Sequence, residues 1–259
     1  MPEVLLDIKQ LSVSLDEGNR KILNAVDFSV PTHNICALVG GSGSGKTTLG
    51  LSVMRLLGAG LYVSGGQIIF DSQDVLSMKE NDMRRLRGKS IGMVFQEPLN
   101  AFNPILKIGY QIDEVFKAHT SYSASLRKEK MYALLSHVGI PDPKRIAEQY
   151  PHQLSGGLRQ RAMIAQAVAA SPKLIIADEP TSNLDVTLQA KILELFLRLK
   201  KEMDLTILLI THDLGLVSHV CDYMGILNKG ELVESGVPSV VLGAPKHPYT
   251  QMLLESNIL

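Results

Sequence analysis

The sequence has few cysteines, no tryptophan and no surplus of charge of either sign. Two cysteines in 259 residues are too few for a disulfide framework or an iron–sulfur cluster. Lysine plus arginine and aspartate plus glutamate both number 26, so no global basic field indicates a nucleic-acid partner. No apolar run approaches the roughly 18 residues of a membrane span, and the start lacks a charged-then-apolar export signal. These absences predict a globular cytoplasmic protein.

A glycine-rich stretch beginning at Gly40 organises the rest of the chain. Gly40, Gly45, Lys46 and Thr47 fit the pattern G-x-x-x-x-G-K-[ST], in which backbone N–H groups face a phosphate, lysine reaches the β/γ-phosphates and the hydroxyl ligates Mg²⁺. An apolar run at 35–39 predicts a strand before it, and helical spacing predicts a helix after it. A glycine-rich turn that binds nothing is the alternative. We predict that the nucleotide is held by Gly40, Gly41, Ser42, Gly43, Ser44, Gly45, Lys46, Thr47 and Thr48.

The remaining patterns predict an α/β fold. Alternating apolar residues at 4–15 and 22–30, joined by a polar turn, predict an antiparallel β layer. The pair Gly65-Gly66 predicts a chain break before a strand at 67–70. Uninterrupted apolar runs, separated by an amphipathic helix, predict strands of a doubly wound parallel core sheet. We expect one domain, 1–259, with the β layer and catalytic core at 1–96 and 151–259, a helical subdomain at 97–172 and a C-terminal tail at 236–259.

A second anion site is indicated near residue 155, where Ser155 is the expected cap of a helix that ends before Pro172. Arg159 and Arg161 lie near the positive end of this helix, and no carboxylate occupies its first turn. A bound anion would offset the unfavourable interaction between these arginines and the positive end of the helix dipole. The alternative is that both arginines point into solvent or pair with distant acids.

These motifs together resemble the ATP-binding cassette (ABC) ATPases over nearly the whole chain. Leu154 to Gly157 match the family signature, and the other motifs follow in the family's order. In that family two cassettes pack head to tail. The resemblance implies a dimer in which Ser155, Gly156 and Gly157 act in trans on ATP held by the partner, and Asp185 belongs to the segment that links the cassettes.

Asp178 and Glu179 end one of the expected buried strands, at the edge where ligands of open α/β sheets bind. Asp178, with Thr47, would hold Mg²⁺, and Glu179 would be the general base for the attacking water. A helix cap or a surface pair is the alternative. By resemblance, Gln96 senses Mg²⁺ and the attacking water, and His212 contacts the γ-phosphate, although a lone histidine at a strand end is more often structural.

Two residues depart from the family pattern. Leu15 stands where an aromatic residue usually stacks on adenine, so stacking is weaker or supplied elsewhere. Asn183 stands where alanine is common, which indicates a partner cassette of different sequence. The six histidines other than His212 show no metal-ligand spacing.

The segments 95–98, 103–104 and 247–250 resemble the peptide and nickel importer branch of bacterial ABC ATPases. Peptide types commonly carry a C-terminal cysteine cluster, which this sequence lacks, and tend to have Glu at the position of Gly41. We therefore expect an ATPase that powers uptake of nickel or a metal chelate, with di- or oligopeptides as the alternative. A non-transport ABC ATPase and a module that binds ATP without hydrolysis are further alternatives.

The resemblance also implies partners and a location. We expect a second, related ATPase chain, two transmembrane permease subunits and an extracytoplasmic solute-binding protein, with no nucleic acid. The chain would lie peripherally on the cytoplasmic face of the cell membrane. Apolar residues after Gln96 either form the local core of the helical insertion or line a groove for a permease helix. We expect the groove, and thus expect Phe102→Ala to leave stability nearly unchanged.

Overall fold

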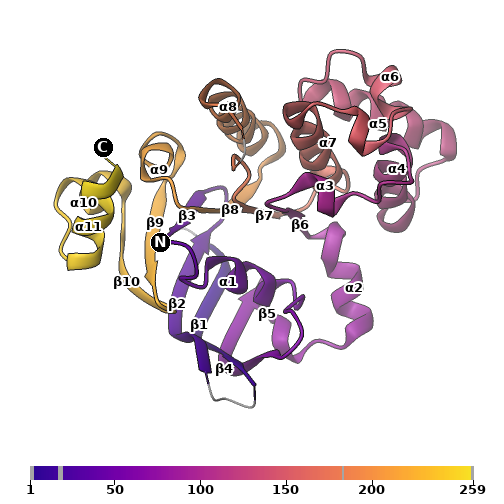
Figure 1. Cartoon of the computed structure of the whole chain (residues 1–259). Coiled ribbons are helices and arrows are strands. Elements are labelled where there is room, and N and C mark those ends of the chain that lie inside the picture. The colour runs from indigo at the N-terminus through magenta and orange to yellow at the C-terminus, as the bar shows by residue number, and fades with distance from the viewer. Residues whose placement is uncertain (1–2, 17–19, 183, 258–259) are drawn as a thin grey trace. The chain divides into compact units, whose positions relative to one another are not determined.

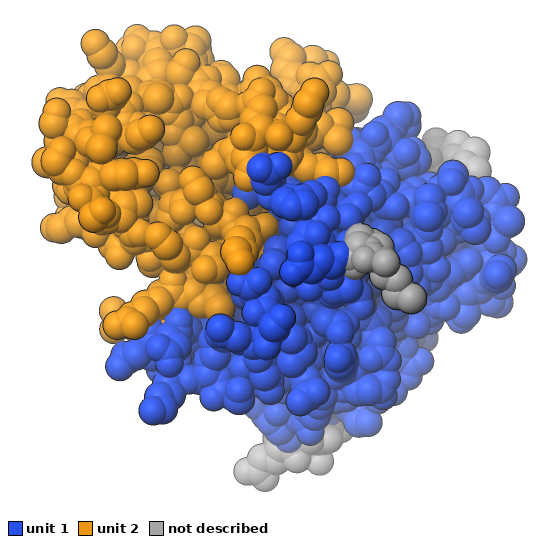
Figure 2. All heavy atoms as spheres, turned by 180° about the vertical axis from the view of Figure 1, so that it is seen from behind, with its two compact units in different colours: residues 1–83, 204–259 blue, residues 84–203 orange. Residues whose placement is uncertain are grey.

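The computed structural model describes residues 3–16, 20–182 and 184–257, which form two compact units (Figure 2). Unit 1 comprises residues 1–83 and 204–259, and unit 2 comprises residues 84–203. The predicted division into one domain with a helical subdomain and a tail stays a prediction. The expectations for Asn183 and for the centre of the first polar turn lie outside the described residues. Among the described residues, no helix is both long enough and apolar enough to cross a bilayer.

Unit 1 begins with the predicted antiparallel layer, whose strands are ordered β2-β1-β4-β5. Alternate side chains of β1 and β2 are buried because one face of this sheet packs on the core. A 3-10 turn, η1 (Val75–Ser77), follows the last strand. The strands are β1 (Val4–Leu15), β2 (Arg20–Pro31), β4 (Leu61–Phe70) and β5 (Gln73–Asp74).

The predicted chain break at Gly65 and Gly66 is wrong, because both glycines lie inside β4, which begins at Leu61. The pairing of β1 with β4 changes register opposite them. Gln10 and Gly66 both have left-handed backbones, with φ of 48° and 89°. A Cβ on Gly66 would lie 2.4 Å from the carbonyl oxygen of Gln10. The glycines therefore admit a β-bulge at a place that the sequence pattern marks as a turn.

The second sheet of unit 1 contains the parallel strands β9, β3 and β8, with β10 antiparallel to β9. Every residue of β3 and β8 is buried, as expected for strands covered on both faces. Helices α9, α10 and α11 lie beside β9 and β10 (Figure 1). The elements are β3 (Ile35–Val39), α1 (Lys46–Val53), β8 (Thr206–Thr211), α9 (Leu214–Val220), β9 (Tyr223–Asn228), β10 (Glu231–Gly236), α10 (Pro238–Gly243) and α11 (Pro248–Asn257).

Unit 2 contains the parallel strand pair β6 and β7 and the predicted helical insertion, in which α4, α5 and α6 pack on one another. Helix α2 (Glu80–Lys89) crosses the boundary between the units. The elements are β6 (Ile91–Val94), α3 (Pro98–Ala101), α4 (Ile108–His119), α5 (Ala124–His137), α6 (Pro143–Ala147), η2 (Pro151–Gln153), α7 (Gly156–Val168), β7 (Leu174–Asp178) and α8 (Val186–Met203).

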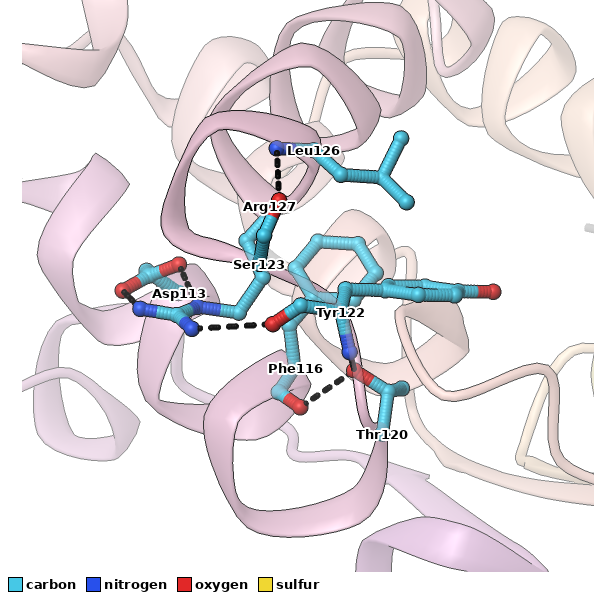
Figure 3. A network of polar contacts seen from close by, with 7 residues as sticks. All are labelled: Asp113, Phe116, Thr120, Tyr122, Ser123, Leu126 and Arg127. Atoms are coloured by element: carbon cyan, nitrogen blue, oxygen red, sulfur yellow. Dashed lines mark hydrogen bonds and ion pairs between the residues drawn. The ribbon is translucent and has the colours of Figure 1, made fainter.

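A polar network fixes the turn between α4 and α5 (Figure 3). Arg127 on α5 forms two hydrogen bonds with the carboxylate of Asp113 on α4, at 2.7 and 3.3 Å. Its third bond, at 3.2 Å, goes to the carbonyl oxygen of Tyr122 in the turn. Ser123 caps α5 by accepting the N–H of Leu126. One guanidinium therefore ties both helices to the turn that joins them.

The segment after Gln96 is divided between core and surface. Phe102, at the end of α3, is only 2% exposed, and α3 packs against α7. The expectation that loss of this ring would leave stability unchanged is therefore wrong. Leu99 and Ile105 are 48% and 77% exposed, so they form the part of the segment that is open to another molecule.

The buried ring makes a prediction about stability. Phe102→Ala should lower the free energy of unfolding by about 3–5 kcal/mol, because it removes a buried aromatic side chain and leaves a cavity. Leu99→Ala is the control, and its half-exposed side chain should cost far less. Urea unfolding of the chain measures both. Equal stability of the two variants would contradict a core position for Phe102.

Candidate functional site

The predicted site residues fall into two groups, one in each unit. In unit 1 the glycine-rich loop joins β3 to α1. Lys46 is 5% exposed, and its Nζ donates to the carbonyl oxygens of Gly40 at 2.7 Å and Gly41 at 2.9 Å. Ser42, Gly43 and Thr47 are exposed, with Thr48 partly so. The ammonium of Lys46 is thus already folded over the loop.

The loop has the form of a phosphate cradle. Gly43 and Gly45 have left-handed backbones, with φ of 73° and 105°. A Cβ on Gly40 would lie 2.2 Å from the carbonyl oxygen of Leu227, so the loop backbone needs glycine there. The buried hydroxyl of Ser44 has no hydrogen-bond partner within the described residues. Helix α1 has no side-chain cap and no acid in its first turn, and its N-terminus therefore favours an anion.

His212 lies at the same edge of the sheet as this loop. β3 and β8 run parallel, with Val39 opposite Thr211. The loop starts after Val39 and His212 follows Thr211, so both leave the sheet from adjacent strand ends. His212 is exposed, and Asp213 beside it caps α9 by accepting the N–H of Leu216 at 3.2 Å. The strand register therefore places His212 next to the phosphate loop.

In unit 2, Gln96 and Glu179 follow adjacent parallel strands, in which Val94 lies opposite Ala177. Gln96 Nε2 donates to Glu179 Oε2 at 3.3 Å. The hydroxyl of Ser182, a residue that was not among the predicted site residues, donates to the carbonyl oxygen of Glu179 at 2.9 Å. The structure thus brings the predicted base and the predicted sensing glutamine into contact.

Asp178 and Glu179 have different surroundings although they are adjacent. Asp178 ends β7 and is 3% exposed, whereas Glu179 is half-buried. Glu179 has a left-handed backbone, with φ of 43°, which is uncommon for a residue other than glycine and clusters at functional sites. The oxygen donors predicted for Mg²⁺ are a hydroxyl, an amide and a carboxylate, on Thr47, Gln96 and Asp178. This all-oxygen donor set suits a hard cation.

The signature residues begin α7 as predicted. Ser155 is the N-cap, and its Oγ accepts the N–H of Leu158 at 3.4 Å. Ser155 and Gly156 are exposed, while Gly157 is buried against Leu188. Asp185 caps the start of α8 by accepting the N–H of Leu188 at 2.9 Å. The exposed start of α7 is a surface that another molecule can reach.

The interpretation of Arg159 and Arg161 as an unsatisfied pair awaiting an anion is wrong. Arg159 donates to the carbonyl oxygens of Pro151 at 3.0 Å and Leu154 at 2.8 Å. Arg161 donates to the carbonyl oxygen of Val138. Both cations therefore have backbone acceptors, which a sequence pattern does not show. Among the described residues, no three His, Cys, Asp or Glu side chains cluster as a metal site.

Comparisons with known proteins agree with this geometry. A family model described as ABC transporter matches residues 23–182. The oligopeptide transport ATP-binding protein OppD of Lactococcus lactis subsp. cremoris is 45% identical over 257 residues, or 98% of this chain and 76% of that protein. The dipeptide transport ATP-binding protein DppD of Haemophilus influenzae is 42% identical over 254 residues, or 97% of this chain and 77% of that protein.

A solved structure shares the fold. The dimeric post-hydrolysis state of the ATP-binding cassette MJ0796, bound to ADP and Pi, matches with a TM-score of 0.79 and 26% identity, covering 90% of this chain and 98% of that one. The predicted ABC-type α/β fold is confirmed. The names of the relatives support the peptide alternative better than the metal uptake that the sequence led us to favour.

The hydrogen bonds from Arg159 to two backbone carbonyls lead to a prediction that distinguishes a structural role of this residue from a role in anion binding. Arg159→Met should lower the free energy of unfolding by about 1–3 kcal/mol, because it removes charged donors from two buried or partly buried carbonyls. Arg145→Met is the control, since the side chain of Arg145 forms an exposed ion pair with Asp142 at 3.4 Å. Thermal unfolding checks both. An unchanged free energy of unfolding for Arg159→Met would contradict a structural role of these hydrogen bonds.

Proposed function

The chain belongs to the ABC transporter family, and we propose that it is the ATP-hydrolysing subunit of an importer for di- or oligopeptides. Its relatives with peptide-transport names align along almost the whole chain. The observation that carries the catalytic part is the contact between Gln96 and Glu179 at two adjacent strand ends. Binding and hydrolysis of ATP are properties of this family.

We propose that the loop of unit 1 binds the phosphates of ATP. The left-handed glycines and the start of α1 direct N–H groups to the anion, and Lys46 neutralises charge on the β- and γ-phosphates. The buried hydroxyl of Ser44, which has no hydrogen-bond partner among the described residues, adds a donor. His212, one strand away, contacts the γ-phosphate.

Glu179 then accepts a proton from the attacking water, because its carboxylate lies beside the amide of Gln96, which orients the same water. Thr47, Gln96 and Asp178 would hold Mg²⁺, which when bound offsets negative charge on the phosphates. Little covalent chemistry remains for the protein, so positioning and electrostatics supply most of the rate enhancement.

We also propose that the chain works as one of a pair of cassettes. Ser155 and Gly156 are exposed at the positive end of the α7 dipole, and the first turn of this helix contains no acidic residue. This end therefore suits the γ-phosphate of ATP held by a second cassette. Asp185, which caps α8, belongs to the same proposed contact surface.

Two permease subunits and a solute-binding protein complete the proposed importer, with this chain on the cytoplasmic face of the membrane. Leu99, Ile105 and Tyr110 support contact with a permease, because these large apolar side chains of unit 2 are exposed close together in sequence after Gln96. Gln96 would link that contact to the state of the nucleotide.

The role of Glu179 is tested in the assembled importer. Glu179→Gln should retain ATP binding and reduce turnover by about 10² or more, the scale of a lost general base. Glu194→Gln, an exposed site on α8, is the control and should hydrolyse ATP normally. Near-normal hydrolysis by the Glu179 variant would remove this residue from the role.

The cargo is tested by stimulation of ATP hydrolysis. The complex is assembled with its permeases and with binding protein loaded with a mixture of di- to hexapeptides, or with Ni²⁺ alone or as a histidine chelate. We expect stimulation with peptides only, in proportion to peptide uptake into vesicles. Stimulation by Ni²⁺ and not by peptides would restore metal uptake as the function.

A further inference from the structure

A tyrosine far along the chain contacts the phosphate loop. Tyr249, in the first turn of α11, accepts the backbone N–H of Gly41 on its hydroxyl oxygen at 2.9 Å. Both residues belong to unit 1. The sequence marks 247–250 as typical of an importer branch but assigns it no role in the site. The hydroxyl lies against the second residue of the loop.

The bonded peptide group is the one that also holds Lys46. The N–H of Gly41 and the carbonyl of Gly40 belong to the same planar peptide unit, and they point in opposite directions. The carbonyl accepts from Lys46 Nζ at 2.7 Å, and the N–H donates to Tyr249. Rotation of this peptide therefore breaks both bonds together. Tyr249 therefore restrains the position of the Lys46 ammonium through the planar peptide between Gly40 and Gly41.

Tyr249 is itself held in place by β10. Glu234 accepts the N–H of Lys246 at 2.9 Å and of His247 at 3.1 Å, and His247 Nδ1 accepts the N–H of Tyr249 at 3.1 Å. Burial opposes ionisation of Glu234, but the N–H donors, the Thr250 hydroxyl and nearby His247 outweigh it and keep its pKa below the usual value. The Tyr249 side chain also packs on the apolar cluster of β3, β9 and α9.

The space around Gly41 fits this contact. A Cβ on Gly41 would lie 3.0 Å from the Tyr249 hydroxyl, closer than most real Cβ contacts. The hydroxyl and a side chain at position 41 therefore compete for the same space. The need for glycine at position 41 therefore has a steric reason that does not depend on which substrate is transported.

We propose that Tyr249 is a positioning residue for the phosphate loop. Its hydroxyl fixes the Gly40–Gly41 peptide and so holds Lys46 ready for the β- and γ-phosphates, which rests on the proposed function of that loop. Without the hydroxyl the peptide rotates more freely, and ATP must order it on binding. The expected consequence is weaker ATP binding with an unchanged chemical step.

The test compares Tyr249→Phe with Tyr223→Phe. Tyr223 is the matched control, because its hydroxyl also makes one hydrogen bond in unit 1, to Ser235 Oγ at 3.2 Å. Tyr249→Phe should raise the Kd for ATP about three- to ten-fold, the scale of one lost hydrogen bond. It should raise KM for ATP with kcat unchanged in the assembled importer, and speed hydrogen exchange of the Gly41 amide. Tyr223→Phe should match wild type in all three.

A Tyr249 variant with wild-type Kd and wild-type exchange at Gly41 would overturn the proposal, even if its melting temperature fell. If Tyr249→Phe does not fold, the test uses Glu234→Gln, which weakens the hydrogen bonds to the N–H groups of Lys246 and His247 and keeps the Tyr249 hydroxyl. A raised Kd for ATP then supports the proposal, and an unchanged Kd overturns it. A wild-type chain that binds no ATP would instead refute the proposed function.

Discussion

The parallel pairing of β3 with β8 determines where the proposed phosphate-binding residues of unit 1 lie. Both strands are wholly buried, so their side chains have no freedom to shift register without exposing apolar surface. The phosphate loop and His212 follow the adjacent carboxyl ends of these two strands. In unit 2, β6 and β7 do the same for Gln96 and Glu179. Burial of ordinary aliphatic residues therefore sets the geometry of the polar ones.

The sequence predicts the features that depend on local chemistry. The strand at 35–39 and the cap Ser155 were both predicted, because apolar periodicity and capping act over a few residues. The roles of Gln96 and His212 come from resemblance, and the role of Glu179 comes from its position at a strand end; all three stay proposals. The contact of Gln96 with Glu179 agrees with them, but spacing alone does not predict it.

The errors arise where a distant partner decides the outcome. Gly66 looks like a break, but its neighbour across the sheet makes it a bulge. Arg159 looks unsatisfied until the carbonyls of the preceding turn are seen. Gly41 suggested a metal importer, yet the hydroxyl of Tyr249 gives a structural reason for a small residue there. Identity at one loop position is thus weak information about cargo.

The hydrogen bond between Gln96 and Glu179 has a consequence for energy use by the importer. Under the proposed role of Glu179, one oxygen of the base is engaged by an amide and is less available to water. Idle hydrolysis is then limited by how often this bond opens. Under that proposal, a cassette that waits for cargo in this state would conserve cellular ATP, because the bond to Gln96 restrains the base until it opens.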